Sequence, residues 1–70
     1  MIEREGKFIM VTNHHYRIRD VSAVLAVEEK GTLYIKVMLK GVGSYFMTPC
    51  ASEADRQRAI DKIMYILNED

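Results

Sequence analysis

Apolar and polar residues alternate along the first two thirds of the chain and recur at helical spacing in the last third, with Pro49 between the two regions. The first pattern predicts strands and the second predicts a helix. The clearest strand covers residues 32–40, where one face is wholly aliphatic. That face holds Leu33, Ile35, Val37 and Leu39, and the opposite face holds Tyr34, Lys36, Met38 and Lys40. Because successive side chains of a strand point to opposite sides, we expect the aliphatic face to pack in the core.

Four further segments ahead of Pro49 have strand composition, so that residues 7–48 predict an antiparallel meander of four to five strands. These segments are residues 7–12, 16–19, 21–27 and 44–48. Residues 21–27 are apolar on both faces, which is typical of a central strand covered on both sides. Glycine in residues 29–31 and 41–43 supplies turns. Parallel pairing is excluded because it needs connections of about a dozen residues or more.

Residues 52–68 predict one amphipathic helix packed across a face of this sheet. Ser52 precedes Asp55 by three residues, the spacing at which a serine hydroxyl accepts a hydrogen bond from the backbone at a helix start. The apolar stripe of the helix contains Ala59, Ile60, Ile63, Met64 and Leu67. Because residues 63–67 are apolar nearly all round, we expect something besides one sheet face to cover them. The predicted fold class is α+β.

A chain of 70 residues forms a single domain, residues 1–70, with 49% hydrophobic residues and ten basic side chains against ten acidic ones. A core of this size rarely supplies more than about 3–5 kcal/mol, so self-association is expected. The sequence has no signal-peptide pattern at its start and no apolar run of the roughly 20 residues that span a bilayer. We therefore expect a cytoplasmic protein that does not bind membranes.

The residues with chemical potential do not combine into a recognisable catalytic, cofactor or metal site. His14 and His15 are adjacent, and on an extended segment they point in opposite directions, away from any shared ion. Cys50 precedes a helix start, where the dipole can lower a thiol pKa, but a single cysteine is more typical of an inert small hydrophobe. Residues 41–43 lack the third glycine of a phosphate loop. The sequence predicts a protein that is not an enzyme.

The spacing of Asp55, Arg58 and Asp61 is three residues at each step, which on a helix favours weak ion pairs on a solvated face over catalysis.

The strongest functional hypothesis is an assembly module that binds a second copy, as a homodimer, or another protein. Its candidate surface combines aromatic, methionine and lysine side chains that suit interfaces. The candidate residues are Tyr34, Lys36, Met38, Lys40, Tyr45, Met47, Tyr65 and Ile66. The alternative is single-stranded nucleic-acid binding, in which Tyr34 and Tyr45 stack on bases and Lys36 and Lys40 contact phosphates. Zero net charge favours the protein partner.

In the order of its elements, an antiparallel meander followed by one helix, the chain resembles the repeat unit of Pur-type single-stranded nucleic-acid-binding proteins and, equally, many small bacterial and phage domains. The resemblance is one of layout and includes no motif, so it implies no site residues.

Overall fold

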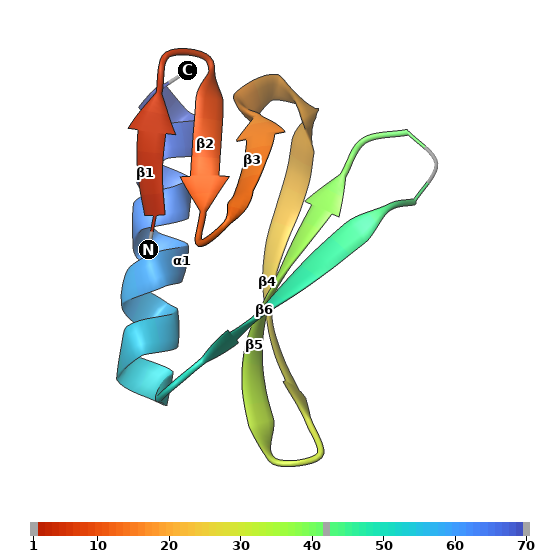
Figure 1. Cartoon of the computed structure of the whole chain (residues 1–70), viewed down its shortest axis with the longest axis vertical. Coiled ribbons are helices and arrows are strands. Elements are labelled where there is room, and N and C mark those ends of the chain that lie inside the picture. Colours follow the sequence, from red (N-terminus) through yellow and green to blue (C-terminus); the bar gives the residue numbers. More distant parts are fainter. Residues whose placement is uncertain (1, 42, 70) are drawn as a thin grey trace.

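Two three-stranded antiparallel sheets and a C-terminal helix make up the computed structural model, which describes residues 2–41 and 43–69 (Figure 1). The first sheet contains β1 (Ile2–Glu5), β2 (Phe8–Val11) and β3 (His14–Arg17). The second contains β4 (Val21–Glu29), β5 (Thr32–Leu39) and β6 (Tyr45–Cys50). A single 3-10 turn, η1 (Ile18–Asp20), separates the sheets, and α1 covers Glu53–Glu69. The α+β class predicted from the sequence is confirmed.

The prediction of one meander of four to five strands is wrong, because the described strands form two sheets. The backbone bonds of η1 explain the division. Ile18 N–H donates to the Lys7 carbonyl oxygen at 2.9 Å, and Lys40 N–H donates to the Asp20 carbonyl oxygen at 2.8 Å. The turn is therefore bonded to the first sheet at one end and to the second sheet at the other.

The strand that the sequence pattern missed is β1. Its residues Ile2, Glu3, Arg4 and Glu5 include one buried side chain and three exposed ones. It pairs with β2 in the register Ile2↔Val11, which places Ile2 in the core beside a valine that is 1% exposed. A segment with one apolar residue shows almost no alternation of apolar and polar side chains. Pairing with β2 is therefore what makes it a strand.

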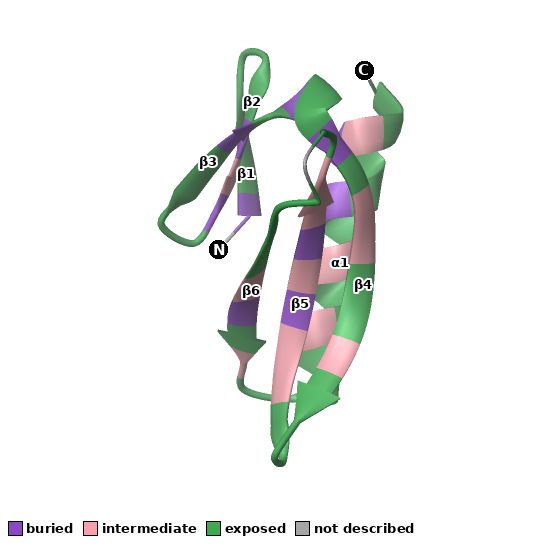
Figure 2. Cartoon of the chain, turned by 90° about the vertical axis from the view of Figure 1, so that its right-hand side faces the viewer, coloured by how far each residue is buried: buried purple, intermediate pink, exposed green. Residues whose placement is uncertain are grey.

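The core lies between both sheets and α1. Its least exposed side chains are Ile9, Val11, Ile35, Val37 and Ile63. Figure 2 shows these buried positions on the first sheet, along β5 and on the helix behind it. The aliphatic face of β5 therefore packs inward as the alternation predicts, with Ile35 and Val37 each 2% exposed.

Strand β6 runs through Pro49 to Cys50, past the end expected at residue 48. The sheet order β4-β5-β6 explains how a proline is accommodated in the strand. Because β6 is an edge strand, the N–H that Pro49 lacks need not reach a second neighbour. The turn at residues 41–43 has Gly41 and Gly43 at positive φ, and the residue between them lies outside the described chain.

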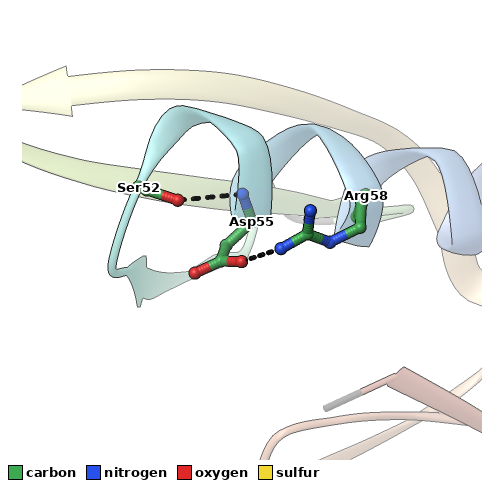
Figure 3. Close-up of polar contacts among 3 residues, drawn as sticks. All are labelled: Ser52, Asp55 and Arg58. Carbon is green, nitrogen blue, oxygen red and sulfur yellow. Dashed lines mark hydrogen bonds and ion pairs between the residues drawn. The ribbon is translucent and has the colours of Figure 1, made fainter.

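Helix α1 begins as the sequence predicts. The Asp55 N–H donates to Ser52 Oγ at 3.1 Å, and Arg58 pairs with the Asp55 carboxylate (Figure 3). Asp61 accepts a 2.8 Å hydrogen bond from Gln57, one turn earlier. The predicted pair of Asp55 and Arg58 is confirmed.

The buried face of α1 is turned relative to the stripe read from the sequence. Ile63 and Ile66 are 1% and 4% exposed, whereas Met64 is 42% exposed. Both sheets pack against α1, and its C-terminal end is fastened to β1 by an ion pair between Arg4 and Glu69 at 3.7 Å. A helix that contacts two sheets buries a wider arc than one lying on a single sheet. We expected something besides one sheet face to cover residues 63–67, and the first sheet does contact α1 through β1, but Tyr65 remains 65% exposed.

Replacing Ser52 by alanine should lower the free energy of unfolding by about 1 kcal/mol, because it removes the acceptor of the Asp55 N–H. Urea denaturation followed by circular dichroism measures this change. Ser44→Ala, outside the helix, is the matched control. Equal midpoints for the two variants would show that the cap does not stabilise α1.

Candidate interaction surface and interior pocket

The second sheet has an outer face, defined by the side chains of β4, β5 and β6 that point away from the core. Three cross-strand rows compose it. They are Ala23–Met38–Tyr45, Leu25–Lys36–Met47 and Val27–Tyr34–Pro49. Figure 2 shows the second sheet from its outer side, with α1 behind β4 and β5. No helix or strand of the described chain lies in front of this face. The fold thus brings together five residues that the sequence analysis placed on its candidate surface.

The residues of β4 were expected to be covered on both sides, and this expectation is wrong. Strand β4 lies at an edge of the sheet, and its outer side chains join the exposed rows. Leu25 is 46% exposed and Tyr45 is 51% exposed, while Val27 is half-buried. The inner face of β4 reaches the core through Val21 and Val24, and its outer face remains accessible.

Lys36 is the charged residue of the three rows, and its side chain reaches an aromatic ring on the neighbouring strand. Its ammonium is 4.2 Å from the centroid of the Tyr45 ring on the neighbouring strand. This distance is within the range of a cation–π interaction. The outer face is therefore mainly apolar, and its one positive charge reaches from the middle row to the Tyr45 ring of the next row.

The edges of the second sheet are less available for pairing than its face. On β4, Arg56 Nη1 reaches from α1 and donates to the Val27 carbonyl oxygen at 3.1 Å. On β6, Pro49 offers no N–H to an added strand. A strand adding to either edge would meet an occupied acceptor or a missing donor.

The remaining candidate residues lie elsewhere. Lys40 is exposed just beyond the end of β5, and its N–H bonds to Asp20. Tyr65 is exposed on α1 and does not belong to the three rows. Ile66 is 4% exposed and lies in the core, so it is not available to a partner.

The two histidines do not converge. The His14 ring lies 5.2 Å from the Phe46 ring, centroid to centroid, whereas His15 Nε2 lies 3.5 Å from Glu5 Oε1 within the first sheet. Among residues 2–41 and 43–69, no three His, Cys, Asp or Glu side chains are placed to hold a metal ion.

An aromatic cluster that the sequence did not reveal joins β3 to β6. The Tyr16 and Phe46 rings are 5.5 Å apart, and His14 contacts both. Burial raises the pKa of the Tyr16 phenol, whose oxygen has no hydrogen-bond partner within the described chain. The cluster therefore packs as an apolar contact between the two sheets. The sequence did not predict it because β3 and β6 are far apart in the chain, and no local pattern indicates a contact between them.

A pocket of about 360 Å³ opens where β1, β5, β6 and the N-terminal half of α1 meet. Its apolar wall includes Ile2, Val11 and Ile35. Its polar wall comes from α1 and includes Asp55, Arg58 and Lys62. Figure 3 shows Asp55 and Arg58 on the side of α1 toward which β1 lies. The sequence analysis assigned the Asp55–Arg58 pair to a solvated helix face, and it could not show that this face borders a pocket.

Cys50 also lines the pocket, with Sγ 3.8 Å from the Thr48 carbonyl oxygen. Burial raises the pKa of the Cys50 thiol, and the nearby Arg56 guanidinium opposes this rise. The thiol is therefore protonated at neutral pH, and a protonated thiol is a poor nucleophile.

We expect the reaction of Cys50 with the uncharged reagent 4,4′-dithiodipyridine to follow a pH profile whose midpoint lies above 9.0, the ordinary pKa of the group. The physical reason is that burial penalises the thiolate. Stopped-flow absorbance measures the rates, and the same protein unfolded in urea is the control. A midpoint in the folded protein at or below that of the unfolded chain would contradict the expectation.

Comparisons of the chain with protein-family models, with curated proteins and with solved structures find no match. The class defined by the fold is an α+β domain of two antiparallel sheets and one helix. No helix in the described part of the chain has the length and apolar character needed to cross a membrane.

Proposed function

We propose that the protein is a non-enzymatic assembly module that forms a homodimer through the outer face of its second sheet. The observation that carries the proposal is the set of three rows on β4, β5 and β6, apolar except for Lys36, that the described chain leaves uncovered. Leu25 and Tyr45 are the most exposed large apolar residues of these rows. Exposed apolar surface gathered on one face is typical of an interface.

A second copy suits this face for three reasons. An isologous dimer matches the same apolar rows against themselves about a two-fold axis. The sequence carries no net charge, so two copies do not repel each other. The Lys36 ammonium already has a contact partner within its own chain, the Tyr45 ring at 4.2 Å.

The area of the outer face sets the affinity that we expect for the dimer. Three strands about 4.8 Å apart, with residues rising about 3.3 Å each along the eight residues of β5, give a face of roughly 400 Å² per copy. Stable interfaces bury about 800 Å² per partner, and smaller ones are weak or transient. We therefore propose a reversible dimer with a dissociation constant in the micromolar range or weaker.

The test of this proposal is the mass of the protein as a function of concentration. Sedimentation equilibrium from about 10 µM to about 1 mM should show a shift from the 8.1 kDa chain mass toward twice that value. A constant mass of 8.1 kDa across this range would exclude the homodimer.

Single-stranded nucleic-acid binding is the second candidate, and the proximity of Tyr34, Lys36 and Tyr45 on one face favours it. The contact between Lys36 and Tyr45 weakens it, because a base that stacks on this ring must first displace the ammonium.

An oligonucleotide titration distinguishes the two functions. If the face binds single strands, affinity should fall with added salt at a slope near −0.7 per phosphate contact, and Tyr34→Ala should cost about 1–3 kcal/mol of binding. We expect no detectable binding at physiological salt, because the chain has no net positive charge. Salt-sensitive binding that Tyr34→Ala abolishes would reverse the order of the two functions.

A further inference from the structure

We propose that the pocket between the first sheet, β5, β6 and α1 binds a small amphipathic monoanion, with an apolar body against the strands and a carboxylate against α1. The pocket is bordered from the second sheet by Ile35 and Thr48, which alternate with the outer-face residues of β5 and β6, and Pro49 is the one residue that belongs to both the pocket lining and the outer-face rows. The site does not depend on the proposed dimer.

The apolar wall of the pocket can hold the ligand's hydrocarbon body. Ile2, Val11 and Ile35 are 6%, 1% and 2% exposed, so the core fixes the floor of the pocket before a ligand arrives, and most of its accessible apolar surface comes from the less buried residues at its rim. Ala59 from α1 and the protonated thiol of Cys50 add further surface of low polarity. A volume of about 360 Å³ lies near the lower end of the range of small-molecule sites. The ligand is therefore small.

The polar wall determines the charge of the ligand. Arg58 and Lys62 are one helical turn apart, so they lie on one face of α1. Asp55 pairs with Arg58, whereas Lys62 has no ion pair with any described residue. Two cations and one carboxylate leave a single positive charge beside the apolar wall. This charge matches one carboxylate better than a neutral molecule or a cation.

The binding requires no covalent step. Because burial raises the pKa of Cys50, the thiol stays protonated and serves as part of the wall. Its position nevertheless makes it a reporter, since a ligand in the pocket shields Sγ from a reagent in solution.

Octanoate is the probe for the test, added to the full-length protein below its micelle concentration. We expect saturating octanoate to slow the reaction of Cys50 with 4,4′-dithiodipyridine at least ~5-fold, since Cys50 lines the pocket and a bound hydrocarbon chain would cover its thiol. The matched probe is 1-octanol, which has the same hydrocarbon chain without the charge. Octanol should need at least ~10-fold higher concentration for equal protection if the carboxylate is recognised.

One variant and a matched control test whether Lys62 supplies the positive charge that binds the carboxylate. Lys62→Gln should raise the octanoate concentration for half protection at least ~10-fold, whereas Lys36→Gln on the outer face should leave it unchanged. Shifts of backbone amide NMR signals give a second measurement and should centre on Ile35, Cys50 and Ala59. These variants replace side chains that do not lie in the core, so the fold is retained.

Three results would overturn the proposal. The first is an absence of both protection and NMR shifts at millimolar octanoate. The second is equal protection by octanol and octanoate, which would show that the anion is not recognised. The third is a set of shifts confined to the outer-face rows, with Lys36→Gln weakening the binding in place of Lys62→Gln.

Discussion

Replacing Ile63 by alanine should lower the free energy of unfolding by about 2–5 kcal/mol. Ile63 is 1% exposed on α1, in the core that both sheets share. The substitution removes buried apolar atoms, and the surrounding strands cannot close fully over the space they leave. Because a core of this size supplies roughly 3–5 kcal/mol in total, the variant should be at or beyond the limit of folding at room temperature. Urea midpoints measured by circular dichroism give the change.

The neighbouring residue supplies the control for this experiment. Met64 is 42% exposed, so Met64→Ala should change stability by less than about 1 kcal/mol. If Ile63→Ala does not fold, Ile63→Val provides a graded measurement with an expected loss of about 0.5–1.5 kcal/mol. Equal midpoints for the Ile63 and Met64 variants would mean that α1 presents a different face to the sheets.

Replacing Leu25 by glutamate should weaken the dimer at least ~100-fold, or by roughly 2.7 kcal/mol of association free energy. Leu25 is 46% exposed in the middle row of the outer face, beside Lys36. In a face-to-face dimer the new carboxylate and the Lys36 ammonium beside it would both lose their water, and desolvation costs several kcal/mol per ion, which their mutual attraction does not fully repay. Sedimentation equilibrium should then find only the 8.1 kDa chain at concentrations where the parent protein associates.

Phe8→Glu is the matched control because Phe8 is also a large apolar residue, 41% exposed, on the outward side of the other sheet. It should leave the association unchanged. Dissociation by Phe8→Glu together with an unaffected dimer in Leu25→Glu would place the interface on the first sheet and refute the outer face of the second sheet as the contact.

Patterns among residues close in the sequence predicted most of the secondary structure. The alternation over 32–40 encodes which face of β5 is buried, because side chains two residues apart share a face. The start of α1 is encoded within four residues, since Ser52 bonds the backbone of Asp55. Signals of this kind need no information from distant parts of the chain.

The sequence predictions were wrong where the structure of a segment depends on residues far away in the chain. Three of the four side chains of β1 are exposed, and pairing with β2 makes this segment a strand. The buried arc of α1 includes Ile66 and leaves Met64 exposed, because two sheets pack against the helix and the sequence predicted one. The spacing of apolar residues correctly predicted a helix, but it did not show which side of the helix faces the two sheets.

The α+β class, the antiparallel pairing, the position of the helix and its cap, and the outward-facing side chains of β5 all followed from the amino-acid pattern. The division of the strands into two sheets, the uncovered outer face of β4, and the pocket shared by Ile2 and Lys62 emerged only from the folded chain. The two groups of features differ in the range of the interactions that produce them. Alternation, capping and turns act between residues a few positions apart, whereas the sheet division depends on the bonds of η1 to Lys7 and Lys40, and the pocket depends on packing between opposite ends of the chain.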